Sequence, residues 1–150
     1  MDNVLMQFKD LGAAAAVCLS ACGSGLGAGV AGMAAIGAWK KCYAQNKAAP
    51  FLLLAFVGAP LTQTIYGLIL MNAITDAAKG GIFFWGMGIL GGLAMGISAW
   101  MQGKAAASAA DAFAETNKGF TNYLIVVGII ETVALFIMAF LLGKVAVFSS

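Results

Sequence analysis

Four long stretches of this sequence contain almost no charged residues. Residues 11–39, 48–75 and 80–103 have none, and residues 119–143 have only Glu131. Each stretch is longer than the roughly 20 residues that an α-helix needs to cross about 30 Å of hydrocarbon. The sequence therefore predicts an all-α membrane protein with four transmembrane helices.

The composition supports this prediction and excludes several kinds of protein. Of the 150 residues, 62% are apolar and 9% are charged, whereas about 25% are charged in an ordinary soluble domain. The chain has neither histidine nor arginine, which excludes histidine-based catalysis and most zinc sites. Its net charge of +2 is too small for a nucleic-acid-binding surface. We expect neither a soluble enzyme nor a nucleic-acid partner.

Polar turns join the four helices into two hairpins. The turns lie at residues 46–50, 76–81 and 116–119, where helix-breaking and polar residues gather. We predict a single membrane domain over residues 1–150, with hairpins at 11–75 and 81–146. Five lysines lie near the two hairpin turns and three lie on the other side. The positive-inside rule then places the turns in the cytoplasm and the termini outside the cell membrane.

An internal repeat relates the two hairpins. An offset of 64 aligns the glycine-rich first and third helices, so that Gly27 corresponds to Gly91. An offset of 68 aligns the second and fourth helices, so that Gln63 corresponds to Glu131. A four-residue difference in the turn accounts for the change of offset. The chain is thus a tandem pair of hairpins in one orientation, and its glycines favour a closely packed inner layer of many helices, as in a ring.

Glu131 is the one charged residue inside a predicted span. Its nearest charged neighbours, Lys118 and Lys144, are 13 residues away on either side, which is about 20 Å along a helix. An ionised carboxylate near the middle of a bilayer costs at least about 2.5 kcal/mol. Glu131 therefore binds a cation or a proton there, and the simpler alternative is a protonated glutamate that only hydrogen-bonds a neighbouring helix.

Polar residues in the other spans are placed to join Glu131. Thr62, Gln63 and Tyr66 lie in the middle of the second helix, and folding the second hairpin about its turn brings Gln102 level with Glu131. Side-chain oxygens around one negative charge suit a small alkali cation, whereas a proton needs only the carboxylate. The Tyr66 hydroxyl can donate a hydrogen bond to that carboxylate.

Two features of the sequence, Lys104 and the cysteines, each allow more than one interpretation. Lys104 should lie near the depth of Gln102, so it snorkels, faces a ring lumen, or marks a site nearer the cytoplasmic side. Cys18, Cys22 and Cys42 are interpreted as small apolar residues without metal partners. The alternative for Cys22 is the end of a lipoprotein cleavage box, whose processing would remove the first 21 residues.

Taken together, these motifs resemble the proteolipid (c or K) subunits of V-type rotary ATPases, in the duplicated four-helix form of bacteria and archaea. The resemblance rests on the glycine-rich helices and on three segments, which are Pro60–Gly67, Gln102–Lys104 and Ile130–Thr132. It implies a rotor ring that carries Na⁺, or H⁺, on Glu131. The implied sodium ligands are Glu131, Thr62, Gln63, Gln102 and the main-chain carbonyl of Ala59, with Tyr66 bonded to Glu131. Leu61 departs from the pattern, in which a glycine is expected.

The resemblance also implies partners. These are further copies of the chain in the ring, a stator membrane subunit with an essential arginine, a central-stalk subunit and membrane lipid. ATP hydrolysis would take place on other subunits, so this subunit would itself be non-catalytic. The alternatives are a ring that carries only H⁺, a stand-alone four-helix cation-coupled antiporter, and a purely structural membrane protein.

Overall fold

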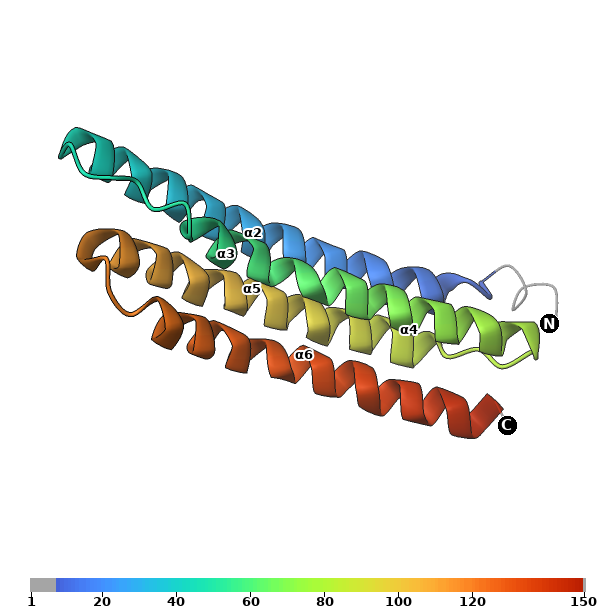
Figure 1. The fold of residues 1–150 in the computed structure, drawn as a ribbon. Coiled ribbons are helices and arrows are strands. Elements are labelled where there is room, and N and C mark those ends of the chain that lie inside the picture. Colours follow the sequence, from blue (N-terminus) through green and yellow to red (C-terminus); the bar gives the residue numbers. More distant parts are fainter. Residues whose placement is uncertain (1–7, 150) are drawn as a thin grey trace.

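The computed structural model describes residues 8–149, which form long helices along one axis (Figure 1). Three helices are continuous: α2 (Leu11–Ala44), α5 (Trp85–Thr116) and α6 (Phe120–Ser149). The remaining one consists of α3 (Leu53–Gly58), the 3₁₀ turn η1 (Ala59–Leu61) and α4 (Thr62–Lys79). The described residues contain no strand, and the predicted all-α fold is confirmed. The predicted domain over 1–150 extends beyond them at residues 1–7 and 150.

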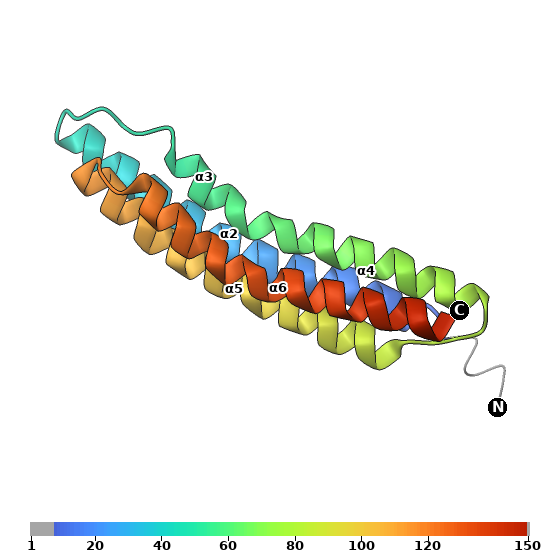
Figure 2. The same cartoon turned by 60° about the horizontal axis from the view of Figure 1, so that its bottom comes forward.

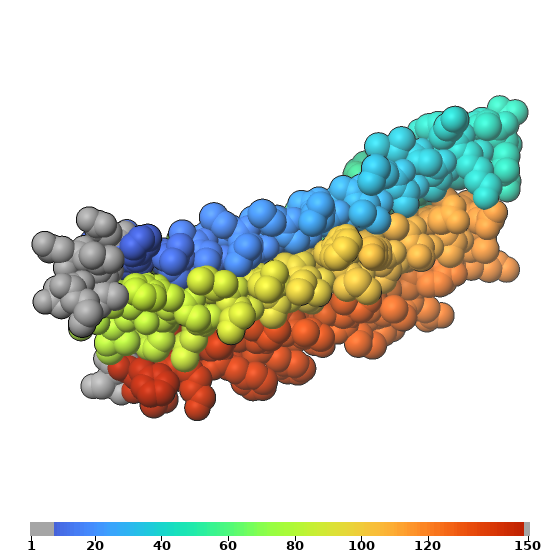
Figure 3. Space-filling model, turned by 180° about the vertical axis from the view of Figure 1, so that it is seen from behind, coloured from blue at the N-terminus to red at the C-terminus, as the bar shows by residue number. Residues whose placement is uncertain are grey.

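The two hairpins lie side by side in the same orientation. The connections at residues 45–52 and 117–119 lie at one end of the molecule. The start of α2, the 80–84 connection and the end of α6 lie at the other end (Figures 1 and 2). Seen from behind, α5 lies between α2 and α6 along most of its length (Figure 3). Helices α2 and α5 therefore run parallel, as the tandem repeat requires.

Glycines bring α2 and α5 into backbone contact. A Cβ atom on Gly103 would overlap the backbone of Gly27, and one on Gly88 would overlap that of Gly12. Both pairs are 76 residues apart, so Gly27 faces Gly103 and not Gly91. The offset of 64 expected from the repeat is therefore wrong as a spatial register. Small residues recur at similar spacings along both helices, so several offsets align them almost equally well.

The connections also differ from the expected repeat. The first, at residues 45–52, is longer than the second, at residues 117–119. With the second-helix offset of 68, the expected first-helix offset of 64 would instead have made the first connection the shorter. Extra residues in the first connection fit the larger offset of 76 between α2 and α5.

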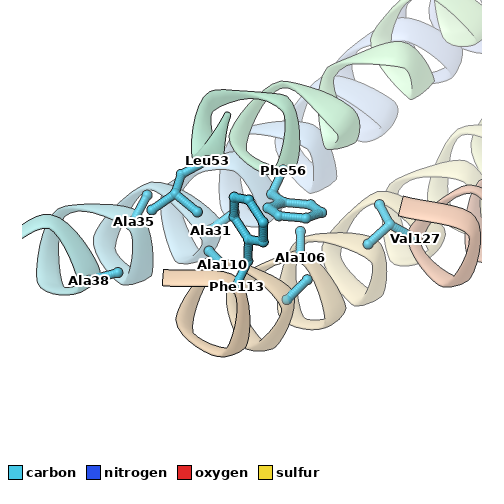
Figure 4. Close-up of a cluster of buried hydrophobic side chains, with 10 residues drawn as sticks. Ala31, Ala35, Ala38, Leu53, Phe56, Ala106, Ala110, Phe113 and Val127 are labelled. Carbon is cyan, nitrogen blue, oxygen red and sulfur yellow. The ribbon is translucent and has the colours of Figure 1, made fainter. Parts of the chain in front are cut away.

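Two apolar clusters hold the helices together, one on each side of the middle of the bundle along its long axis. Near the hairpin turns, Leu53 and Phe56 of α3 pack against Phe113 and the alanines of α2 and α5 (Figure 4). Phe120 joins this cluster, with its ring centroid 5.3 Å from that of Phe56. Toward the other end, a second cluster includes Leu70, Ile74, Met95 and Ala134. Buried polar residues lie between the two clusters.

Within the described residues, three helical segments are long and apolar enough to cross a membrane: Leu11–Ala44, Leu53–Lys79 and Phe120–Phe148. We predicted four spans, and α5 does not reach the same apolarity although it has 32 residues. Several of its glycines, among them Gly88, Gly92 and Gly103, meet the backbone of α2. Helix α5 thus has the length to span a membrane, although it is less apolar than the other three segments.

Candidate cation site

An interruption in the second long helix gathers three oxygen atoms. Pro60 has no N–H group to continue the helical hydrogen bonds, and residues Ala59–Leu61 form a 3₁₀ turn there. The hydroxyl of Thr62 lies 3.1 Å from the carbonyl oxygen of Ala59 and 3.1 Å from Oε1 of Gln63. A hydroxyl has one hydrogen to donate, so Thr62 can satisfy only one of these two acceptors at a time.

Two buried amides continue from this turn to α6. Nε2 of Gln63 donates to Oε1 of Gln102 at 2.7 Å, and both glutamines are fully buried. Nε2 of Gln102 donates to Oε2 of Glu131 and to the carbonyl oxygen of Val127, each at 3.2 Å. The two hydrogens of the Gln102 amide are thus both used, and its side chain is fixed between α4 and α6.

Glu131 receives a hydrogen bond on each carboxylate oxygen. The Tyr66 hydroxyl donates to Oε1 at 2.7 Å, while Gln102 donates to Oε2. Glu131 and Tyr66 are half-buried, in contrast to the two glutamines. The carboxylate therefore lies at the edge of the polar cluster, where an ion could reach it from the surface of the bundle.

The structure also adds a residue that the sequence analysis did not single out. The Ser98 hydroxyl of α5 donates to the carbonyl oxygen of Ile130 at 3.0 Å. Together with the bond from Gln102 to Val127, this contact holds α6 against α5 along the helical turn that precedes Glu131. Ser98 lies four residues before Gln102, on the same face of the helix, and that spacing is the signal that could have identified it.

Lys104 does not belong to this cluster. Its side chain is exposed, and its ammonium nitrogen lies 4.2 Å from the centre of the Trp100 ring, one turn earlier on α5. The cation lies over an aromatic face, an arrangement that stabilises a lysine at a partly apolar surface. The structure thus places Lys104 on an exposed face of α5, outside the polar cluster.

The cysteines are all free, with Cys18 and Cys22 exposed on α2 and Cys42 buried near the carbonyl oxygen of Ala114. Loss of the first 21 residues would remove the contact of Gly12 with Gly88. Residues 8–149 contain no group of three or more His, Cys, Asp or Glu side chains that could hold a metal ion. The polar cluster described above has the carboxylate of Glu131 together with neutral oxygen atoms of other residues.

The arrangement has the chemistry that a small alkali cation needs. The oxygens of Ala59, Thr62 and Gln63 come from one long helix, and the carboxylate of Glu131 comes from α6. Gln102 lies between them and contacts both sides. The structure thus brings together every residue that the sequence analysis assigned to the site, and hard oxygen donors around one negative charge favour an alkali cation over a transition metal.

The second hairpin matches the sequence model of a known protein family. Residues 85–142, from the first residue of α5 into α6, match the family model that describes the C subunit of ATP synthase. No curated protein gave a significant match to the chain. The matched segment contains both Gln102 and Glu131. The second hairpin thus has the sequence pattern of the ATP synthase C-subunit family, which supports a membrane proteolipid of the ion-transporting rotor ring of a rotary ATPase.

Proposed function

We propose that this chain is a rotor-ring subunit of a V-type ATPase or ATP synthase that carries Na⁺ on Glu131. The observation that carries the proposal is the convergence of Tyr66, Gln102 and the Gln63–Thr62 oxygens on one carboxylate in a membrane protein. We also propose that α5 crosses the membrane as the fourth span, because its length matches that of its neighbours.

The ion would be held between the second long helix and α6. The oxygens of Ala59, Thr62 and Gln63 would replace water around Na⁺, and Glu131 would supply the negative charge. Neutralising the carboxylate removes most of the penalty for moving it through hydrocarbon. The donors Tyr66 and Gln102 would hold the carboxylate in place before and after the ion binds.

Rotation would then carry Glu131 between the lipid and a stator subunit. At the stator, an arginine of that subunit would exchange with the ion at the carboxylate, since this chain has no arginine of its own. The half-buried position of Glu131 at the edge of the bundle supports this access. ATP hydrolysis would take place in a separate sector linked through a central stalk, with the hairpin turns on the cytoplasmic side.

The chain has one such carboxylate for four helices. Gln63, a neutral residue, is the counterpart of Glu131 in the offset-68 repeat. A ring built this way moves fewer ions per turn for a given number of helices, which favours ion pumping over ATP synthesis. The same geometry serves either direction of rotation.

The test is carbodiimide labelling of Glu131 in the purified protein, with Na⁺ varied and choline as the control cation. Carbodiimides react with protonated carboxyl groups, so we expect Na⁺ to slow labelling in a concentration-dependent way. Absence of protection at every pH would leave protons as the only cargo. A matched pair sharpens the test: Thr62→Ala should weaken protection, whereas Thr132→Ala should not, because that exposed hydroxyl bonds only the carbonyl of Ile129.

Two further measurements separate the remaining functions. A large SDS-resistant oligomer in native electrophoresis is expected for a ring, and a dimer would favour a stand-alone antiporter. Glu131→Gln should abolish ion transport in proteoliposomes that contain the whole ATPase, whereas unchanged transport would point to a purely structural protein.

A further inference from the structure

Ser24 carries a buried hydroxyl that the candidate cation site does not account for. It lies in α2 with a side chain only 1% exposed, and its Oγ has no hydrogen-bond partner in the described residues 8–149. Ser20, one turn earlier, makes the usual bond of a helical serine, to the carbonyl oxygen of Ala16 at 2.7 Å. A buried hydroxyl without a partner is unfavourable, so Ser24 requires an explanation.

The register of α2 against α4 puts Ser24 level with Gln63. A Cβ on Gly67 would lie 2.7 Å from the Ser20 Oγ, which fixes one pair of facing residues. The two helices run in opposite directions, so four residues forward on α2 correspond to four residues back on α4. That step leads from Ser20 to Ser24 on one helix and from Gly67 to Gln63 on the other.

A second contact fixes the same register. A Cβ on Gly27 would lie 2.9 Å from the Cβ of Pro60. Gly27 lies seven residues after Ser20 on α2, and Pro60 lies seven residues before Gly67 on the facing helix, so both pairs give the same register. Pro60, Gln63 and Gly67 are spaced by three and four residues, so they share one face of the helix. All three are buried. Gln63 therefore lies on the face of α4 that meets α2.

The Gln63 amide has one hydrogen left over. Its oxygen accepts from Thr62, and one hydrogen of its Nε2 goes to Gln102. A glutamine amide has two hydrogens, and the second has no acceptor among residues 8–149. A buried donor without an acceptor and a buried hydroxyl without a partner thus lie at the same level on facing helices.

We propose that Ser24 positions the Gln63 amide by accepting its second hydrogen, directly or through one water molecule. This inference rests on the proposed cation site. The Ser24 hydroxyl would donate its own hydrogen to the carbonyl oxygen of Ser20, as Ser20 does to that of Ala16. With both Nε2 hydrogens engaged, the Gln63 oxygen stays turned toward Thr62 and Ala59, where it can serve as a cation ligand. The first hairpin, which has no carboxylate of its own, would thereby set the orientation of a ligand.

The test compares Ser24→Ala with Ser20→Ala in the full chain. Both replace a buried serine on the same helix, one turn apart, but the Ser20 hydroxyl already has its acceptor. The first readout is the Na⁺ concentration that halves carbodiimide labelling of Glu131. Loss of one neutral hydrogen bond should raise it about 3- to 10-fold in Ser24→Ala and leave it unchanged in Ser20→Ala. Equal effects of the two variants, or none from Ser24→Ala, would overturn the proposal.

The second readout does not depend on sodium. Protein labelled with ¹⁵N in its glutamine side chains gives one NH₂ pair for each glutamine, and Gln63→Leu identifies the Gln63 pair. We expect Ser24→Ala to shift one of its two hydrogen resonances and Ser20→Ala to shift neither. If Na⁺ protects no variant, the sodium assignment falls, and this resonance alone decides the Ser24 contact: a shift supports it, and no shift refutes it.

Discussion

Replacing Gly92 by alanine should separate α2 and α5. A Cβ on Gly92 would lie 2.5 Å from the carbonyl oxygen of Ala15 and 2.9 Å from that of Ala16, whereas ordinary contact begins at 3.4 Å. The helices would have to move apart by about 0.9 Å, the difference between 3.4 and 2.5 Å. Because the obstacles are backbone atoms, no side-chain rotation relieves the overlap.

The expected cost follows from the balance of two effects. Overpacking of this kind costs about 1–3 kcal/mol, and replacing glycine by alanine within a helix returns about 0.5–1 kcal/mol. Gly128→Ala is the matched control, since no atom outside its own helical turn lies within 4 Å of the new Cβ. It should receive the helix-propensity gain without the overlap.

The measurement is unfolding in mixed micelles with increasing SDS, followed by circular dichroism. We expect Gly92→Ala to unfold more easily than Gly128→Ala, with a difference of about 1–3 kcal/mol in the free energy of unfolding. If Gly92→Ala is as stable as its control, the close approach of α2 and α5 does not exist in the protein, and the register derived from it is wrong.

Three further predictions concern the site and the ends of the helices. Glu131→Gln should remove carbodiimide labelling altogether, which mass spectrometry of the modified peptide would show, and persistent labelling would mean that another carboxyl reacts. Tyr66→Phe removes one donor to the carboxylate, so Na⁺ protection should weaken by about 10-fold, since hydrogen bonds to charged groups are worth roughly 1.5 kcal/mol; an unchanged midpoint would contradict the contact. Near the hairpin turns, the hydrogen bond and the charge of Lys41 lower the pKa of Glu115. At pH values above the ordinary glutamate pKa, this exposed pair therefore stabilises the fold slightly. The stabilisation is lost as the pH falls through the lowered pKa. Glu115→Gln should therefore unfold with a flatter dependence on acidic pH than the parent, and identical profiles would show that the pair contributes nothing.

The candidate site could be predicted largely because its residues are rare. A single carboxylate stands out in a long uncharged stretch, and a short turn fixes which residues of a hairpin lie level. Counting about residues 116–117 therefore places Gln102 beside Glu131, where the structure has it at 3.2 Å. The structure adds the 3₁₀ turn at Ala59–Leu61, where Pro60 has no N–H group to continue the helical hydrogen bonds.

The packing between hairpins could not be predicted in the same way. Glycine and alanine recur along α2 and α5, and their alignment does not distinguish an offset of 64 from one of 76. Ser24 and Ser98 look in sequence like any small helical residue, and only the neighbouring helices give them partners or leave them without one. The direction of Lys104 depends on which face of α5 is covered, a property of the assembled bundle.

The low apolarity of α5 has a consequence for how the protein enters the membrane. Recognition of a span during synthesis depends on its own hydrophobicity, and α5 is less apolar than the other three segments, while its glycines meet the backbone of α2. We therefore expect α5 to insert poorly when expressed alone and efficiently when α2 precedes it or α6 follows. Its entry would be a joint event of neighbouring segments, so a glycine substitution that loosens α2 from α5 could reduce the yield of inserted protein before it affects transport.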